Sequence, residues 1–162
     1  MDLGSYNAAA RDTAVAALRP CADIAGWLAA VTDARPYATV VELLERAAEE
    51  SEHWQIDDVD AALGMHPRIG ESAAGASTEA RLSRREQPPA DPETAAAITA
   101  GNAEYERRFG RIFLVRAAGR TAQDILAALT ARLRHSPDVE DKIVVDQFRE
   151  IALLRLEGLI TP

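Results

Sequence analysis

The sequence has little cysteine and little histidine, and this bounds its redox and metal chemistry. Cys21 is the single cysteine among 162 residues, so an intramolecular disulfide is excluded. Three scattered histidines and one cysteine give no zinc-ligand spacing. We therefore predict no metal site, and we expect the chain to work in a reducing cytoplasm.

Lysine and long apolar runs are also scarce, and the positive charge is carried by arginine. Lys142 is the single lysine, and the formal net charge is −8. Because phosphate binding relies on clustered Lys and Arg, we expect no nucleic-acid partner. No apolar run approaches the length of a membrane span, and Met1–Tyr6 lacks the basic and apolar regions of a signal peptide. We therefore expect no membrane association.

Helix-favouring residues dominate what is present. Alanine, leucine, glutamate and arginine are abundant, and no stretch shows sustained period-two alternation. The composition predicts an all-α fold, a compact helical bundle of about seven to nine helices. The length suits one domain covering residues 1–162.

Start and stop signals predict the boundaries of these helices. Ile112–Val115 is a short apolar run that we expect to be an extended connection through the core. The predicted helices run from an Asn7 cap to about Leu18, over Ile24–Val31, from a Thr39 cap, over Asp57–Leu63, around Ser83–Glu86, from Pro92 behind an Asp91 cap to Phe109, from a Thr121 cap, and from Pro137 to about Leu159.

His66 is the histidine best placed for chemistry. Pro67 follows it and disfavours the helical region for it, so His66 is expected to be extended at the lip of a helix end. An imidazole held in this way can face a pocket, and its near-neutral pKa suits proton transfer at physiological pH. The alternative is a structural or solvent-exposed histidine.

Polar residues downstream of this loop share one helical face. Ser83, Glu86 and Gln87 are spaced by three and four residues. A histidine and a carboxylate on separate elements can act as an acid/base pair if the fold brings them together. The alternative is a solvated face, given the neighbouring Arg84 and Arg85.

The final predicted helix places a charge on its apolar face. At roughly 100° per residue, Arg155 falls on one line with Val144, Phe148 and Ile151. A buried guanidinium needs an anion, which is either a buried carboxylate of the protein or a substrate carboxylate. The same angles turn Arg149 toward the solvent, so a register error in this helix would exchange the two arginines.

Two further segments carry polar or small residues among apolar ones. Asn102 lies on an otherwise apolar stripe, where a core amide that satisfies a backbone group is the simpler interpretation. The segment 113–119 is either pure core or a place where Ala117, Ala118 and Gly119 let backbone amides approach a ligand.

Four motifs in order along nearly the whole chain resemble the OHCU decarboxylases. OHCU is 2-oxo-4-hydroxy-4-carboxy-5-ureidoimidazoline, an intermediate between urate and allantoin. The motifs are His66-Pro67-Arg68-Ile69-Gly70, Ser83-x-x-Glu86-Gln87, Asn102-x-x-Tyr105-x-x-x-Phe109-Gly110-x-x-Phe113-Leu114-Val115 and Ile151-x-x-x-Arg155-Leu156.

The resemblance implies an all-α homodimer that needs no cofactor and converts OHCU to (S)-allantoin and CO2. The family's catalytic histidine and glutamate correspond to His66 and Glu86, and its arginine near the C-terminus corresponds best to Arg155. The positions that match its substrate contacts are Pro67, Ser83, Gln87 and the main chain of Val115, Arg116, Ala117, Ala118 and Gly119.

The chain departs from the family pattern at two places. The usual Phe-Gly-Phe-Pro-Phe has Arg111 and Ile112 at its third and fourth positions, and Arg116-Ala117-Ala118 replaces the common Cys-Ala-Arg. These departures leave room for a lyase or hydrolase acting on another ureido or hydantoin compound. A helical interaction module without catalysis is the alternative if His66 and Glu86 lie far apart.

Overall fold

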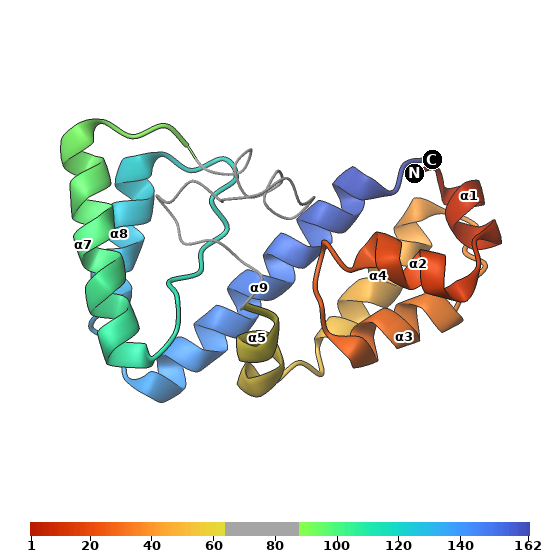
Figure 1. Cartoon of the computed structure of the whole chain (residues 1–162), viewed down its shortest axis with the longest axis horizontal. Helices are drawn as coiled ribbons and strands as arrows, with labels where there is room; N and C mark the ends of the chain where they lie inside the picture. Colours follow the sequence, from red (N-terminus) through yellow and green to blue (C-terminus); the bar gives the residue numbers. More distant parts are fainter. Residues whose placement is uncertain (64–87) are drawn as a thin grey trace. The chain divides into compact units, whose positions relative to one another are not determined.

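The computed structural model describes residues 1–63 and 88–162 (Figure 1). Regular structure in these two ranges is helical, apart from one isolated bridge between Asp2 and Thr161. The prediction of an all-α fold is confirmed. Five predicted site residues lie outside the described residues: His66, Pro67, Ser83, Glu86 and Gln87.

The chain divides into two compact units, each with its own buried residues. Unit 1 comprises residues 1–62 and 149–162, and unit 2 comprises residues 63–148. The prediction of a single domain over residues 1–162 stays a prediction.

Unit 1 is built from short helices with apolar inner faces. Trp27 and Trp54 are buried there and pack edge to face, with ring centroids 5.8 Å apart. Its helices are α1 (Leu3–Ala8), α2 (Arg11–Leu18), α3 (Ala25–Asp33), α4 (Val40–Ser51), all but the last residue of α5 (Ile56–Leu63), and the end of α9 (Pro137–Leu159). The predicted Thr39 cap is confirmed, since the Thr39 hydroxyl accepts from the Glu42 amide at 3.1 Å.

The prediction of one helix from Asn7 to Leu18 is wrong. The chain forms α1 and α2 instead, separated by Ala9 and Ala10 in extended conformation. Asn7 lies inside α1, where its side chain donates to the Tyr37 carbonyl at 2.8 Å and accepts from the Tyr37 amide at 3.0 Å. The Asn7 side chain, which the local sequence suggested as a helix cap, therefore binds the backbone of Tyr37, thirty residues further along the chain.

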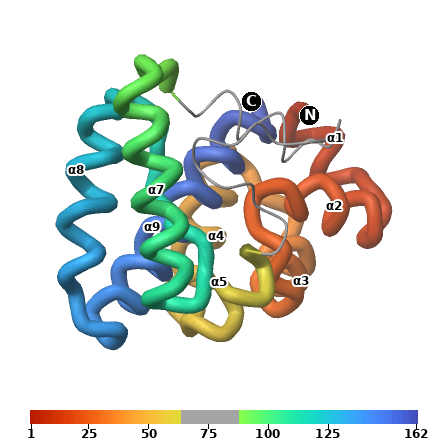
Figure 2. Tube along the Cα trace, turned by 60° about the vertical axis from the view of Figure 1, so that its left-hand side comes forward, coloured from red at the N-terminus to blue at the C-terminus, as the bar shows by residue number. Residues whose placement is uncertain are grey.

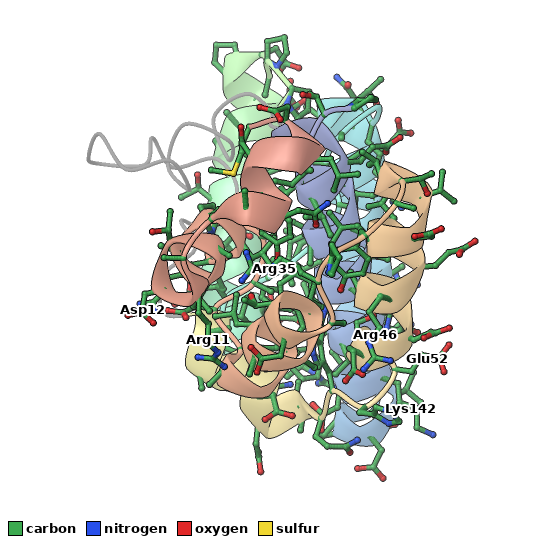
Figure 3. All side chains as sticks on the ribbon, turned by 90° about the vertical axis from the view of Figure 1, so that its right-hand side faces the viewer. Arg11, Asp12, Arg35, Arg46, Glu52 and Lys142 are labelled. Atoms are coloured by element: carbon green, nitrogen blue, oxygen red, sulfur yellow. The ribbon has the colours of Figure 1, made fainter. Side chains whose placement is uncertain are left out.

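Arg35 satisfies helix ends in unit 1. Its Nε donates to the Thr32 carbonyl at 2.8 Å, and its Nη1 donates to the carbonyls of Tyr6 and Ala9 at 2.7 and 2.9 Å. Figure 3 shows the side chain among these helices, and its guanidinium also lies 5.3 Å from the centre of the Tyr6 ring. Arg35 thus supplies additional donors to carbonyls at the ends of α1 and α3.

Unit 2 places two helices side by side. These are α7 (Pro92–Phe109) and α8 (Ala122–Arg132), which run together in both Figure 1 and Figure 2. The predicted Asp91 cap, helix end at Phe109 and Thr121 cap are confirmed; Gly110 follows Phe109 at φ +72°, and Thr121 forms a capping box. The first part of α9, up to Phe148, completes the unit.

The connection between α7 and α8 is non-helical, as predicted, and passes through the core of unit 2. Phe113, Leu114 and Val115 are each less than a tenth exposed. They share an apolar cluster with residues of both helices, which are Ile98, Tyr105, Ala122, Ile125 and Leu129. The connection is therefore fixed by side chains on either side of its backbone.

Candidate active-site residues and family

Arg155 lies in unit 1 and is 3% exposed, as the apolar stripe of the final helix predicted. Its Nη1 donates to the Pro20 carbonyl at 3.2 Å. Burial raises the pKa of the neighbouring Cys21 thiol to about 12, although the positive charge of Arg155 opposes this shift. Arg155 therefore supplies a positive charge inside unit 1 beside the turn that follows α2.

Arg149 does not face the solvent, so this part of the sequence interpretation is wrong. The side chain is half-buried, and its Nε and Nη2 donate to the Ser51 carbonyl at 3.3 and 3.1 Å. Ser51 is the last residue of α4, whose terminal carbonyls have no partners within the helix. One role of Arg149 is therefore to donate hydrogen bonds to the last carbonyl of α4.

The segment Val115–Gly119 lies in unit 2 and ends in a tight turn. The Arg120 amide donates to the Ala117 carbonyl at 3.0 Å, and Gly119 has φ +78°. A Cβ at Gly119 would meet no atom of the described residues within 4 Å, and its positive φ is a backbone conformation that favours glycine.

Within the described residues, most amides of this segment have no hydrogen-bond partner. The Arg116 amide donates to Gln147 Oε1 at 3.0 Å. Within residues 1–63 and 88–162, the amides of Val115, Ala117, Ala118 and Gly119 make no hydrogen bond. Because Val115 and Ala117 are also buried, their N–H groups are donors that a bound ligand could satisfy.

A buried charge cluster supports this segment, and the sequence interpretation missed it. Glu140 is fully buried on α9, and its Oε1 accepts from Arg132 Nε at 2.7 Å and from the Tyr105 hydroxyl. Arg132 Nη1 donates to the Leu114 carbonyl at 2.6 Å. His135 Nδ1 lies 2.9 Å from Glu140 Oε2. Burial and the carboxylate raise the pKa of Tyr105 above its ordinary range, so the hydroxyl stays protonated as a donor.

A periodicity signal for this cluster was present in the sequence. Glu140 lies four residues before Val144 on the buried stripe of α9, and Arg132 lies three residues after Leu129 on the buried stripe of α8. Two opposite charges on two apolar stripes indicate a buried ion pair.

The residues that depart from the family pattern have structural partners. Arg111 is half-buried and forms a salt bridge with Asp141 on α9. Arg116 is half-buried as well, and its backbone amide donates to Gln147.

Asn102 belongs to the motif that matches the family. It lies on the apolar stripe of α7 and is buried, with 5% of its surface exposed.

No group of three or more His, Cys, Asp or Glu side chains in residues 1–63 and 88–162 could hold a metal ion. In the same part of the chain, no helix has both the length and the apolar character needed to cross a membrane.

Two curated proteins are similar in sequence. The uric acid degradation bifunctional protein TTL of Arabidopsis thaliana is 34% identical over 106 residues, which is 62% of this chain and 33% of that protein. The 2-oxo-4-hydroxy-4-carboxy-5-ureidoimidazoline decarboxylase of Amia calva is 28% identical over 137 residues, which is 82% of this chain and 78% of that protein. The chain thus spans a third of the plant protein and most of the Amia calva protein.

Two solved structures share the fold. A crystal structure of OHCU decarboxylase in the presence of (S)-allantoin has a TM-score of 0.70 at 24% identity, covering 86% of this chain and 93% of that one. A crystal structure of (S)-allantoin synthase has a TM-score of 0.72 at 19% identity, covering 99% of this chain and 54% of that one. The model of the OHCU decarboxylase family matches residues 7–157. Because this match covers nearly the whole chain, the protein belongs to the OHCU decarboxylase family.

Proposed function

We propose that this chain is a carboxy-lyase that converts OHCU to (S)-allantoin and CO2 in urate degradation. The observation that carries the proposal is the match of the family model over residues 7–157. Additional support comes from the Amia calva relative, named for this decarboxylation, and from the structural neighbour crystallised with (S)-allantoin.

The substrate can serve as its own electron sink. OHCU carries its carboxylate on the carbon next to a ring C=N bond. When the bond to CO2 breaks, its electron pair moves toward that imine, as it moves toward the ketone in a β-keto acid. The protein then has three tasks: to hold the carboxylate out of the ring plane, to control the proton of the adjacent hydroxyl, and to protonate the ureido-bearing carbon from one face.

Three side chains are assigned to these tasks. Glu86 controls the hydroxyl proton, His66 delivers the proton to one face of the carbon, and Arg155 orients an anionic group of the substrate. The burial of Arg155 supports its assignment, because a guanidinium away from water attracts an anion strongly. Positioning and acid/base work each lower the barrier by several kcal/mol.

The remaining residues bind the substrate. Ser83 and Gln87, with Pro67 beside the histidine, contact its ureido and ring groups. Main-chain groups of Val115, Arg116, Ala117, Ala118 and Gly119 form a second set of contacts. The amides of Val115, Ala117, Ala118 and Gly119 make no hydrogen bond within the described residues, and carbonyl and carboxylate oxygens of OHCU can accept from them, which supports the assignment.

Assembly and location are part of the same proposal. The family resemblance favours a homodimer, and the single cysteine favours the reducing cytoplasm. Light scattering on the purified chain tests the first of these, and a dimer mass is expected.

Circular dichroism of allantoin formation tests the activity. OHCU is generated in place from urate by the two enzymes that precede this step, and the rise of the (S)-allantoin signal is followed. The wild-type chain is expected to accelerate this rise, and His66→Ala is expected to abolish the acceleration. His53→Ala is the matched control, because His53 is an exposed histidine outside the proposed site. A wild-type trace that follows the slow racemic decay without protein would refute the proposal.

A further inference from the structure

We propose that Arg132 is a positioning residue that sets the direction of the Val115 amide, and that Gln147 does the same for the next peptide. The inference rests on the proposed function, in which this amide is one of the donors to the substrate. Both side chains and the segment that they hold belong to unit 2.

Arg132 is a rigid anchor for the Leu114 carbonyl. Its Nη1 donates to that oxygen at 2.6 Å, and its Nε donates to Glu140 Oε1 at 2.7 Å. The guanidinium also lies 4.7 Å from the centre of the Phe113 ring. A planar fork held by a carboxylate on one side and a ring on another has little freedom, so the carbonyl that it binds is fixed as well.

Fixing this carbonyl also fixes the Val115 amide. Leu114 C=O and Val115 N–H belong to one planar trans peptide, in which the oxygen and the hydrogen point in opposite directions. The Val115 N–H therefore points away from Arg132. Turning this peptide over would place the N–H against the guanidinium and would leave a charged donor without its acceptor.

Gln147 holds the following peptide in the same manner. Its Oε1 accepts from the Arg116 amide at 3.0 Å. Since Arg116 N–H and Val115 C=O share one peptide plane, the Val115 carbonyl is directed away from Gln147. Two successive peptides are thus anchored by side chains from α8 and α9, and the N–H of the first, that of Val115, makes no hydrogen bond within the described residues.

The burial of the ion pair supports a positioning role. Arg132 is 6% exposed and Glu140 is fully buried, so both charges have lost their hydration. Buried ion pairs add little net stability compared with apolar side chains of similar size, and in some proteins their role is to specify one arrangement of the groups around them. In unit 2 the arrangement specified by the pair includes the Leu114–Val115 peptide.

Arg132→Lys is the test, and Tyr105→Phe is its matched control. A lysine keeps the charge beside Glu140 but lacks the fork that also reaches Leu114. Tyr105→Phe weakens the same cluster, because it removes a donor to Glu140, yet it keeps the ring and the anchor on Leu114. We expect Arg132→Lys to raise the KM for OHCU about tenfold with a smaller change in kcat, and Tyr105→Phe to keep both within about twofold.

A second readout needs no substrate. The carbonyl carbon of Leu114 is followed by NMR in the wild-type chain and both variants. Its resonance is expected to shift in Arg132→Lys, because the charged donor is lost, and to stay in place in Tyr105→Phe. An unshifted resonance in Arg132→Lys, or an equal rise of KM in both variants, would overturn the inference. A wild-type chain without decarboxylase activity would refute the proposed function, while the NMR comparison would still decide whether Arg132 orients the peptide.

The half-buried Gln147 provides a second pair of variants if Arg132→Lys does not fold. Gln147→Leu removes the acceptor of the Arg116 amide, whereas Gln147→Glu retains an oxygen at that position. We expect the leucine variant to raise KM and the glutamate variant to restore it toward the wild-type value. Equal KM values in the two variants would contradict the role of the acceptor.

Discussion

The buried arginines of this protein differ in what surrounds them. Arg132 in unit 2 is paired with Glu140, whereas Arg155 in unit 1 donates to the Pro20 carbonyl. At the scale of the residue, a buried guanidinium can present a bidentate fork to a carboxylate, so Arg155 stays the residue that we propose to meet the substrate carboxylate.

Replacing each of the two arginines of α9 by lysine distinguishes their roles. Arg155→Lys is expected to lower kcat/KM about 100-fold, because a point charge cannot reproduce a bidentate fork. Arg149→Lys is expected to keep kcat/KM within about threefold. It is expected to lower the free energy of unfolding by about 1 kcal/mol, because it weakens the hydrogen bonds to the Ser51 carbonyl. Steady-state rates and urea unfolding of both variants provide the measurement. The reverse pattern would assign the substrate to Arg149.

At the scale of the element, α7 packs tightly against α8 at Gly101. A Cβ built on Gly101 would lie 2.5 Å from Leu129 Cδ2, and Leu129 is fully buried. We expect Gly101→Ala to destabilise the protein by about 1 kcal/mol, because an overpacking cost of about 1–3 kcal/mol exceeds the gain of about 1 kcal/mol in helix propensity.

Gly158→Ala in α9 is the matched control for this prediction. No atom lies within 4 Å of a Cβ at Gly158, so the substitution keeps the propensity gain without a clash. Thermal unfolding is expected to show a lower Tm for Gly101→Ala and an equal or higher Tm for Gly158→Ala. A higher Tm in both variants would show that Leu129 can move aside.

We expect the stability of the protein to fall in acid through Asp91, the residue that caps the start of α7. The hydroxyl of Thr94 and then its amide donate to this carboxylate, and they hold the pKa of Asp91 below its ordinary value of 3.8. A group whose folded pKa is lowered stabilises the fold above its unfolded pKa, and this contribution is lost as the pH falls through the folded value.

Asp91→Asn separates capping from titration, because asparagine is also a good cap but carries no charge. We expect the wild-type chain to be more stable than this variant at pH 6, with the difference disappearing as the pH falls below 3.8. Asp91→Ala is expected to be the least stable variant at pH 6, since it removes the cap itself. Urea unfolding at several pH values measures these differences, and a pH-independent gap between wild type and Asp91→Asn would contradict the prediction.

At the scale of the whole molecule, one helix contributes to both units. Helix α9 runs unbroken from Pro137 to Leu159, and the boundary between the units falls between Phe148 and Arg149. Because melting the helix in one unit removes hydrogen bonds at its boundary with the other, we expect both units to unfold in one transition. This would agree with the prediction of a single domain.

The positions of the two tryptophans make this test simple. Trp27 and Trp54 both lie in unit 1, so tryptophan fluorescence reports on that unit alone, whereas far-ultraviolet circular dichroism reports on the helices of both. Coincident urea transitions by the two probes are expected for one cooperative domain. Separate midpoints would show two domains.

The sequence by itself determined the fold class, the family and most helix boundaries. Asp91, Gly110 and Thr121 begin or end helices through contacts with residues three or four positions away, so the local sequence contains the needed information. The burial of Arg155 followed from helical periodicity for the same reason. The family resemblance was confirmed because its motifs span the chain, whereas the roles of the individual site residues stay predictions.

Tertiary structure alone decided which polar groups meet. Asn7 binds Tyr37 and does not cap a helix, Arg149 closes the end of α4, and Arg132 and Gln147 anchor the backbone of residues 114–116. In each pair the partners are 18 to 98 residues apart, so local propensity has no influence on the contact. Such pairs form because a polar group that packing has buried must find a partner within reach, and the packing of distant segments determines which partner is there.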